Sequence, residues 1–316
     1  MDQIQSLLKS TAKLYNNTKP HHIECRNLAV AASLKLLRDA HYIRFGSFAG
    51  RPPVEYNVFG VDNVVSRPIR PDIFVSDTGA FAQEYDLLIA DLRSGTVDWQ
   101  SDQTDRANRV VYTAVMSVAC CYDLWRRRSR KTPGTFFEIL MASLLQQMLP
   151  EALLTKHIPL ASLLRDAEVA VVDDTEREIL EGEGPEEDDA SSVSTDLVVG
   201  LRGRSGGIVV PLKITTRERI VQPFAHQRIL DSAFGRGQYR SLLVCISETQ
   251  LDDESRSVKQ VCVPGTVKLF QKYLAPLTGL YYGDVPQRYA ASDVGRIIPV
   301  RSIGHFFRDL SSLARN

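Results

Sequence analysis

A long apolar stretch at residues 105–125 constrains the fold of this chain more than any other feature. Its central part, residues 110–122, has no charged side chain and is interrupted only by the hydroxyl groups of Thr113 and Ser117 among its mostly apolar residues. Such a run is too short to cross a bilayer, which needs about 20 apolar residues. It must be covered by other elements instead, so we predict a buried helix in a globular chain with no membrane segment. At 316 residues the chain is long enough to build such a core.

The charge balance excludes one class of nucleic-acid binder. Lysine and arginine together number 38, as do aspartate and glutamate, so the formal net charge is zero. A protein that coats nucleic acid through a general basic surface would have a clear excess of cations. A sequence-specific binder is still allowed, because it can concentrate its cations in one cleft.

The cysteines point to a cytoplasmic protein. Five are scattered along the chain without a Cys-x-x-Cys pair, which is typical of reduced thiols. His21, His22 and Cys25 lie close together, but no second ligand pair follows at a suitable spacing, so we expect no metal site there. The chain opens on Asp2 and polar residues, and we expect no secretory signal.

The chain divides into two regions near residue 130. Apolar residues recur at helical spacing over 4–15 and 23–40, while 42–74 is rich in Pro, Gly and Val, as in loops with short strands. We therefore predict a mainly helical region over 1–130 and a second unit over 131–316. The second unit has helical sequence at 136–149, after 213 as far as 235, at 266–274 and at 302–313. Strand-like runs at 167–172, 195–201, 208–213, 241–247 and 258–263 alternate with these helices, so the unit is α/β.

Two charged stretches stand out. Residues 173–189 hold ten Asp or Glu among seventeen, and we predict a solvated, mobile insertion at about 173–190 with no catalytic role. The helix at 105–125 is followed by a basic run. These cations suit the C-terminal end of a helix dipole, and they also suit contact with DNA phosphates. The run comprises Arg126, Arg127, Arg128, Arg130 and Lys131.

Asp196 and Lys213 are the first candidate catalytic pair. They lie on two predicted strands joined by a Gly/Arg/Ser turn. In a simple antiparallel hairpin centred between Arg204 and Ser205 they would stand opposite one another, with Cβ atoms about 5 Å apart. A carboxylate and an ammonium group so placed can hold a divalent cation beside an attacking water and neutralise charge on a phosphate. Taken alone, the spacing favours a simpler alternative, a cross-strand ion pair.

The residues after the lysine change that balance. The chain reads Lys213-Ile-Thr-Thr-Arg217-Glu218-Arg219-Ile-Val-Gln222. Over roughly residues 135–230 it resembles the type II restriction endonucleases of the PD-(D/E)xK superfamily that cut CCGG and CCNGG sites, in particular the EcoRII/PspGI branch. The resemblance implies that Lys213 is catalytic and that Arg217, Glu218 and Arg219, followed by Gln222, read GC pairs. The chemistry agrees, because arginine donates a bidentate pair to guanine and a carboxylate accepts from cytosine N4.

A simpler interpretation of this segment stays open. Thr215 and Glu218 have the spacing of a capping box, which would use Glu218 to start a helix. The two arginines would then be ordinary surface charges. We also expect Pro223 to interrupt that helix after one or two turns.

The resemblance implies a second acidic residue on a helix before the hairpin, and Glu138 is the natural match. A glutamate near a helix start is also favoured by the dipole, which is the alternative for Glu138. Asp196 matches the metal-binding aspartate, with Thr195 in place of the usual proline. Pro71-Asp72 is a literal Pro-Asp pair, but no lysine follows it until Lys131, so we interpret it as a chance match.

The chain departs from the family pattern at the two positions where a further carboxylate is expected. The common pattern places it two residues before the lysine, where this chain has Pro211. The branch often supplies it about thirteen residues after the lysine, where this chain has His226 followed by Gln227. These two residues are candidates for a supporting role, since His226 can ligate a metal or act as a base. A structural role for a lone histidine is the alternative.

Together these features predict an α/β PD-(D/E)xK core, a central mixed sheet flanked by helices, after an N-terminal region that serves dimerisation or DNA clamping. The resemblance implies a Mg²⁺-dependent homodimer of a restriction-modification system. It would hydrolyse double-stranded DNA at a palindromic site with CC and GG halves, with Asp196 and Glu138 as metal ligands. Two alternatives keep the fold: a repair or resolvase-type nuclease, and a non-catalytic DNA-binding protein. A metabolic α/β enzyme is the third, but no phosphate-binding glycine loop or nucleophile elbow supports it.

Overall fold

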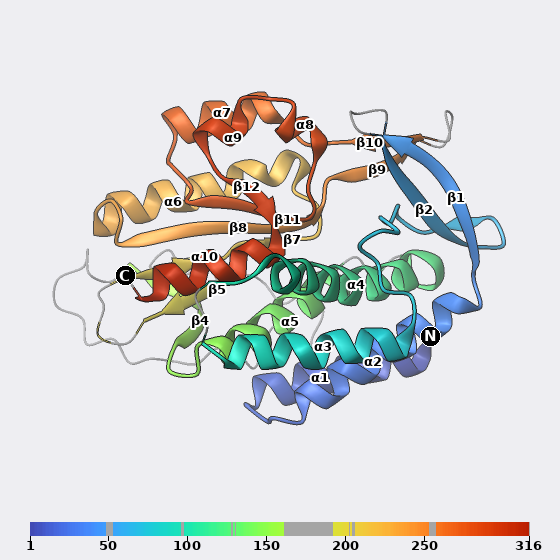
Figure 1. Cartoon of the computed structure of the whole chain (residues 1–316). Helices are drawn as coiled ribbons and strands as arrows, with labels where there is room; N and C mark the ends of the chain where they lie inside the picture. The colour runs from blue at the N-terminus through green and yellow to red at the C-terminus, as the bar shows by residue number, and fades with distance from the viewer. Residues whose placement is uncertain are drawn as a thin grey trace.

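A mixed sheet forms the centre of the computed structural model, which describes residues 1–48, 53–95, 98–127, 129, 131–160, 192–201, 203, 206–252 and 257–315. Its strands run in the order β12-β11-β8-β6-β5-β4, with β7 paired to β8 (Figure 1). Strands β6, β7, β8, β11 and β12 are parallel, whereas β5 is antiparallel to both β6 and β4. The strands span Leu153–Pro159 (β4), Ser192–Gly200 (β5), Gly207–Val209 (β6), Leu212–Lys213 (β7), Tyr239–Ser247 (β8), Gly279–Asp284 (β11) and Val300–Ser302 (β12).

Helices cover both faces of this sheet. One side carries α6 (Val221–Phe234), α7 (Pro264–Tyr273), α8 (Gln287–Ala290) and α9 (Val294–Ile297), and the other carries α4 (Ser101–Trp125), α5 (Thr132–Met148) and α10 (Ile303–Arg315) (Figure 1). A further layer, α1 (Asp2–Asn16), α2 (His22–Arg38) and α3 (Thr78–Arg93), packs against α4 and α5. The predicted α/β fold, a central mixed sheet flanked by helices, is therefore confirmed.

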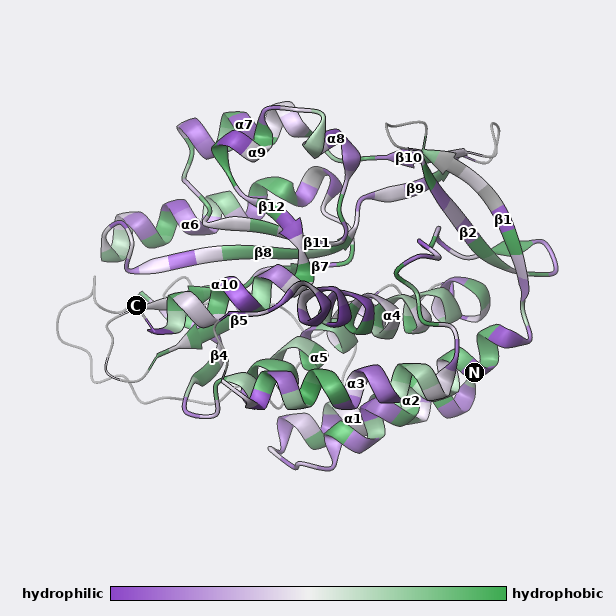
Figure 2. Ribbon diagram, in the orientation of Figure 1, coloured by the Kyte–Doolittle hydropathy of each residue, from purple (hydrophilic) through white to green (hydrophobic). Residues whose placement is uncertain are grey.

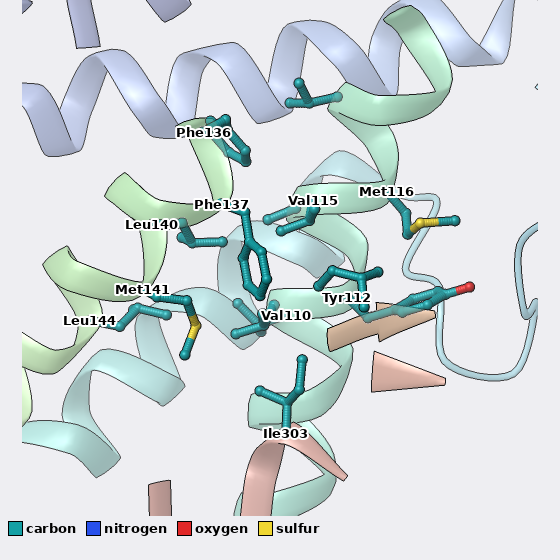
Figure 3. Packing of buried hydrophobic residues seen from close by; sticks show 14 of the residues in the cluster. Val110, Tyr112, Val115, Met116, Phe136, Phe137, Leu140, Met141, Leu144 and Ile303 are labelled. Carbon is teal, nitrogen blue, oxygen red and sulfur yellow. The ribbon is translucent and has the colours of Figure 1, made fainter. Parts of the chain in front are cut away.

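The apolar helix that was predicted from residues 105–125 lies at the centre of the packing. Nearly all of α4 after Asn108 is buried. Figure 3 shows Val110, Val115 and Phe137 packed together between α4 and α5. Figure 2 shows α5 as almost wholly hydrophobic, whereas α6 and α7 alternate hydrophobic and hydrophilic residues. Burying a side chain of this size contributes about 1.5–3 kcal/mol, so this contact is a major source of stability.

The largest hydrophobic core takes residues from both sides of position 130. It includes Leu34 and Leu88 from the N-terminal helices, Leu140 from α5, Val244 from β8 and Phe306 from α10. The two regions that we predicted from the sequence therefore share one core. A role of residues 1–130 in dimerisation or DNA clamping stays a prediction.

A smaller sheet follows the first two helices. Strands β1 (His41–Phe48) and β2 (Val54–Val61) form an antiparallel hairpin, to which β3 (Val64–Val65) is added. The expected short strands in 42–74 are thus longer than predicted. Strands β9 (Thr249–Asp252) and β10 (Ser257–Gln260) pair with one another, and β10 lies beside β1 (Figure 1).

Local chemistry explains several element ends. Helix α4 begins with a capping box between Gln100 and Gln103, and α6 ends at Gly235, which has a φ of +91° that favours glycine. Gly304 lets α10 cross α4 closely, because a Cβ there would overlap the backbone carbonyl of Thr104.

The predicted acidic insertion at 173–190 and the strand at 167–172 lie outside the described residues. No helix in the described part of the chain is long and apolar enough to span a membrane.

Candidate active site

Asp196 and Lys213 meet in the structure. Oδ2 of Asp196, on β5, accepts hydrogen bonds from Lys213 Nζ at 2.8 Å and from the backbone N–H of Leu212 at 2.7 Å. The two side chains are only partly exposed, 20% for Asp196 and 13% for Lys213. Both hydrogen bonds end on Oδ2, and within the described part of the chain none is made to Oδ1.

The route by which they meet differs from the predicted hairpin. The β5–β6 register pairs Val198 with Val209 and Gly200 with Gly207, which would place position 211, not 213, opposite Asp196. The predicted register is therefore wrong by two residues. Pro211 has no N–H to continue the β6 ladder, and after it Lys213 pairs with Cys245 on β8. Lys213 thus reaches Asp196 from β7, which pairs with β8, and not from the strand that pairs with β5.

Glu138 lies on α5 and forms a second carboxylate–lysine pair. Its Oε2 accepts a hydrogen bond from Lys156 Nζ on β4 at 3.0 Å. Burial raises the pKa of Glu138, Asp196 raises it further, and Lys156 and Lys213 oppose this change. Glu138 and Asp196 are therefore close enough to influence one another, as two ligands of one cation would have to be.

These side chains line one cavity of about 460 Å³. Gln222 and His226 complete its charged and polar wall from the start of α6, with Pro223 between them. Burial lowers the pKa of His226, and Lys213 lowers it further against the opposing effect of Asp196, so His226 is held neutral at physiological pH. The remaining lining residues are Ser192, Val193, Ser194, Thr195, Pro211 and Ile229.

The donors of this cavity suit a hard divalent cation. Within the described residues no group of three or more His, Cys, Asp or Glu side chains gathers as a closed metal site. Mg²⁺ does not need one, because it usually binds one or two carboxylates and completes its shell with water and substrate phosphate. Glu138 and Asp196 therefore fit Mg²⁺, with Asp196 offering its Oδ1.

The segment after Lys213 carries two exposed arginines and leads to the cavity wall at Gln222. Residues Arg217–Ile220 form a short 3₁₀ helix that continues directly into α6. Arg217 and Arg219 are exposed and do not line the cavity, whereas Gln222 does. The side chain of Glu218 lies outside the described part of the structure.

One local prediction for this segment was wrong: Pro223 does not interrupt the helix. It lies in the first turn of α6, where a backbone N–H has no partner within the helix, so proline is tolerated there. The residue before the 3₁₀ helix is Thr216, not Thr215, and its side chain does not cap the helix start.

The candidate Gln227 and the chance match Asp72 both lie away from the cavity. The side chain of Gln227 is bonded to the backbone of β8, from Nε2 to Tyr239 O at 3.0 Å and from Ser241 N to Oε1 at 3.0 Å, and it does not line the cavity. Asp72 pairs with Arg70 and does not line the cavity either, which agrees with its interpretation as a chance match.

Comparison with solved structures decides the family. The crystal structure of the type IIP restriction endonuclease Kpn2I matches 100% of this chain and 98% of its own, with 45% sequence identity and a TM-score of 0.85. This chain belongs to the type II restriction endonucleases. It is accordingly a sequence-specific DNA endonuclease. A complex of the restriction endonuclease PspGI with substrate DNA matches 75% of the chain and 92% of its own at 15% identity and a TM-score of 0.40, which is too distant to bear on the site. No protein-family model and no curated protein matches the chain.

Sequence reasoning missed two residues of the endonuclease. Lys156 faces Glu138 only because β4 pairs with β5 across the insertion, and nothing local indicates that pairing. Glu248 is fully buried beneath the Arg217 segment and accepts hydrogen bonds from its backbone. A charged residue directly after the apolar strand 241–247 was the available sign of it.

Proposed function

We propose that the endonuclease is Mg²⁺-dependent and that Asp196, Glu138 and Lys213 form its catalytic centre. The observation that carries this proposal is that two carboxylates and their two lysine partners line one cavity, whose wall at Gln222 lies a few residues after the exposed Arg217 and Arg219. A phosphodiester placed there would lie against Lys213 while adjacent base edges faced the exposed segment.

Asp196 and Glu138 would hold the cation. When bound, Mg²⁺ would supply positive charge against the phosphate and make a water molecule more acidic. Before a cation or DNA binds, a lysine balances the charge of each carboxylate: Lys213 pairs with Asp196, and Lys156 pairs with Glu138. The cation would take over this balance and leave the lysines available to the anionic substrate.

Lys213 and His226 would act on the nucleophile and the phosphate. Lys213 Nζ donates to Asp196 at the cavity wall, so it is held where it can orient water or donate to a phosphate oxygen. His226 lines the same cavity and is held neutral, so it can accept a proton.

Recognition is proposed to come from Arg217, Glu218 and Arg219, with Gln222 at the cavity wall. Two arginines and a glutamate can read guanine and cytosine in the major groove, which supports a site with CC and GG halves. Kpn2I is a type IIP enzyme, and we propose a palindromic site for this chain too. The zero net charge agrees with a local, not a general, DNA surface.

A palindrome is most simply read by a two-fold dimer, so we propose a homodimer with one half-site per subunit. Residues 1–130 would serve dimerisation or DNA clamping, and Arg126, Arg127 and Lys131 would contact phosphates. All five cysteines are unpaired, which supports action in the reducing cytoplasm, where invading DNA is met.

The test is digestion of several plasmid and phage DNAs with the purified protein in Mg²⁺ and in EDTA. We expect discrete fragments only with Mg²⁺, and sequencing of their ends should give one palindrome with CC and GG halves. Cutting that survives EDTA would remove the metal assignment, and ends without CC/GG halves would remove the recognition assignment. Light scattering of the protein with and without a duplex tests the dimer separately.

A further inference from the structure

Glu248 is a buried carboxylate whose side chain binds Thr216 and Arg217, which begin the proposed recognition segment, residues 216–219. It follows Ser247, the last residue of β8, and its exposure is 0%. Its Oε1 accepts hydrogen bonds from the backbone N–H of Thr216 at 3.1 Å and from the Thr216 hydroxyl. Its Oε2 accepts from the backbone N–H of Arg217 at 3.4 Å.

Hydrogen bonds, and no ion pair among the described residues, balance this carboxylate. Within the described part of the chain, no lysine or arginine forms an ion pair with Glu248. A buried charge is tolerated only when hydrogen bonds replace its hydration. Burial raises the pKa of Glu248, while the bonds from Thr216 and Arg217 lower it. The recognition segment and the carboxylate therefore depend on one another: each satisfies polar groups of the other.

The segment has a conformation that needs such a constraint. Arg217 has a φ of +45°, in the left-handed region that residues other than glycine adopt only at a cost. The guanidinium of Arg219 also donates back to Thr215 O at 3.3 Å. Fixing the Arg217 N–H on Glu248 fixes the direction in which the Arg217 side chain leaves the backbone.

Strand β8, which Glu248 follows, also pairs with the strand that carries Lys213. Lys213 pairs with Cys245 on β8, and Ser247 N donates to Ile214 O at 3.0 Å. Glu248 comes three residues after Cys245 and binds the residues three and four positions after Lys213. Strand β8 therefore positions the cutting residue through Cys245 and the reading residue through Glu248, and β8 itself is buried against β6 and β11.

We propose that Glu248 is a positioning residue for DNA recognition: it holds Arg217 in register with Lys213 through the backbone of the 216–217 segment. This inference rests on the proposed reading role of Arg217. Glu248 is fully buried, does not line the cavity and acts only through the segment that it binds.

Glu248→Gln tests the proposal with little change in shape. An amide offers one acceptor oxygen and turns the other position into a donor, so the N–H of Thr216 or of Arg217 loses its acceptor. Binding is measured in Ca²⁺ at one stated salt concentration, to a duplex carrying the site mapped by digestion and to a scrambled duplex. We expect affinity for the site to fall by about tenfold or more, and affinity for the scrambled duplex, which depends on phosphate contacts, to stay within about twofold.

Asp284→Asn is the matched control. Asp284 ends the neighbouring strand β11 and is 2% exposed; it accepts hydrogen bonds from Tyr56 Oη at 2.8 Å, Arg70 Nη1 at 3.0 Å and Ser247 Oγ at 3.4 Å, but none from the recognition segment. Asp284→Asn should lower the melting temperature and leave the ratio of the affinities for the site and the scrambled duplex unchanged. If Glu248→Gln does not fold, Thr216→Val, which removes only the hydroxyl donor to Glu248, should lower that ratio about threefold. A folded variant with an unchanged ratio overturns the proposal.

The double variant Arg217→Ala/Glu248→Gln separates this inference from the recognition role on which it rests. If Glu248 acts through Arg217, the double variant should bind the site about as weakly as Arg217→Ala alone. Additive losses would show that Glu248 does not act through Arg217. If Arg217→Ala itself leaves discrimination unchanged, the recognition assignment fails. If Arg217→Ala loses its preference for the site over the scrambled duplex while Glu248→Gln keeps it, only the positioning role of Glu248 is refuted.

Discussion

Replacing Asp196 by asparagine would separate the charge of this residue from its hydrogen bonds. The bonds from Leu212 N–H at 2.7 Å and Lys213 Nζ at 2.8 Å both end on Oδ2, and an amide oxygen in that place can accept both. The change removes the negative charge proposed to hold Mg²⁺. We expect cleavage to fall by at least about a thousandfold, or roughly 4 kcal/mol in activation free energy.

The stability of Asp196→Asn should change much less. Attraction between Asp196 and Lys213 is offset by their partial removal from water, and loss of the charge also relieves the effect of Asp196 on Glu138. We expect the free energy of unfolding to change by no more than about 1 kcal/mol. Asp196→Ala leaves Leu212 N–H and the Lys213 ammonium without this acceptor and should cost about 2–4 kcal/mol.

Three measurements check these values: plasmid cleavage in Mg²⁺, binding to the mapped site in Ca²⁺, and urea unfolding. Both variants should keep specific binding, because the proposed base contacts lie elsewhere. Near-normal cutting by Asp196→Asn would refute the catalytic assignment. Equal losses of stability in the two variants would refute the view that the hydrogen bonds on Oδ2, and not the charge, secure β7.

Three further predictions follow from single residues. Because burial raises the folded-state pKa of Glu138 above its unfolded value near 4.5, its contribution to stability is present below that pH and is lost as the pH rises through the folded pKa. The melting temperature of Glu138→Gln relative to the wild type should therefore increase from about pH 4.5 to neutral pH, and a difference independent of pH would contradict this. His226, whose pKa is lowered by burial, should titrate by NMR with a midpoint below 6.5, and a higher midpoint would show that it is paired as a cation. Gly304→Ala forces a Cβ into the carbonyl of Thr104 and should cost about 1–3 kcal/mol in urea unfolding, whereas Gly295→Ala, with open space around it, should cost much less.

Residues close together in the chain were predicted well from the sequence. The burial of α4 follows from an apolar run that only a core can cover, and the buried strand 241–247 was predicted almost to its bounds. The spacing from Lys213 to Gln222 pointed to the restriction endonucleases because it lies within one short segment, and the family was confirmed. The roles of the individual residues stay predictions.

Contacts between distant segments were decided by the tertiary structure alone. Lys156 meets Glu138 because β4 pairs with β5, and Glu248 meets Arg217 because β8 ends beneath the 3₁₀ helix. Strand order sets both contacts, and no local pattern encodes that order. The β5–β6 register would place position 211 opposite Asp196, whereas the simple hairpin predicted from the sequence places Lys213 there. The preference for helix or strand thus depends on neighbouring residues, whereas the partner of a buried charge depends on which strands lie side by side in the core.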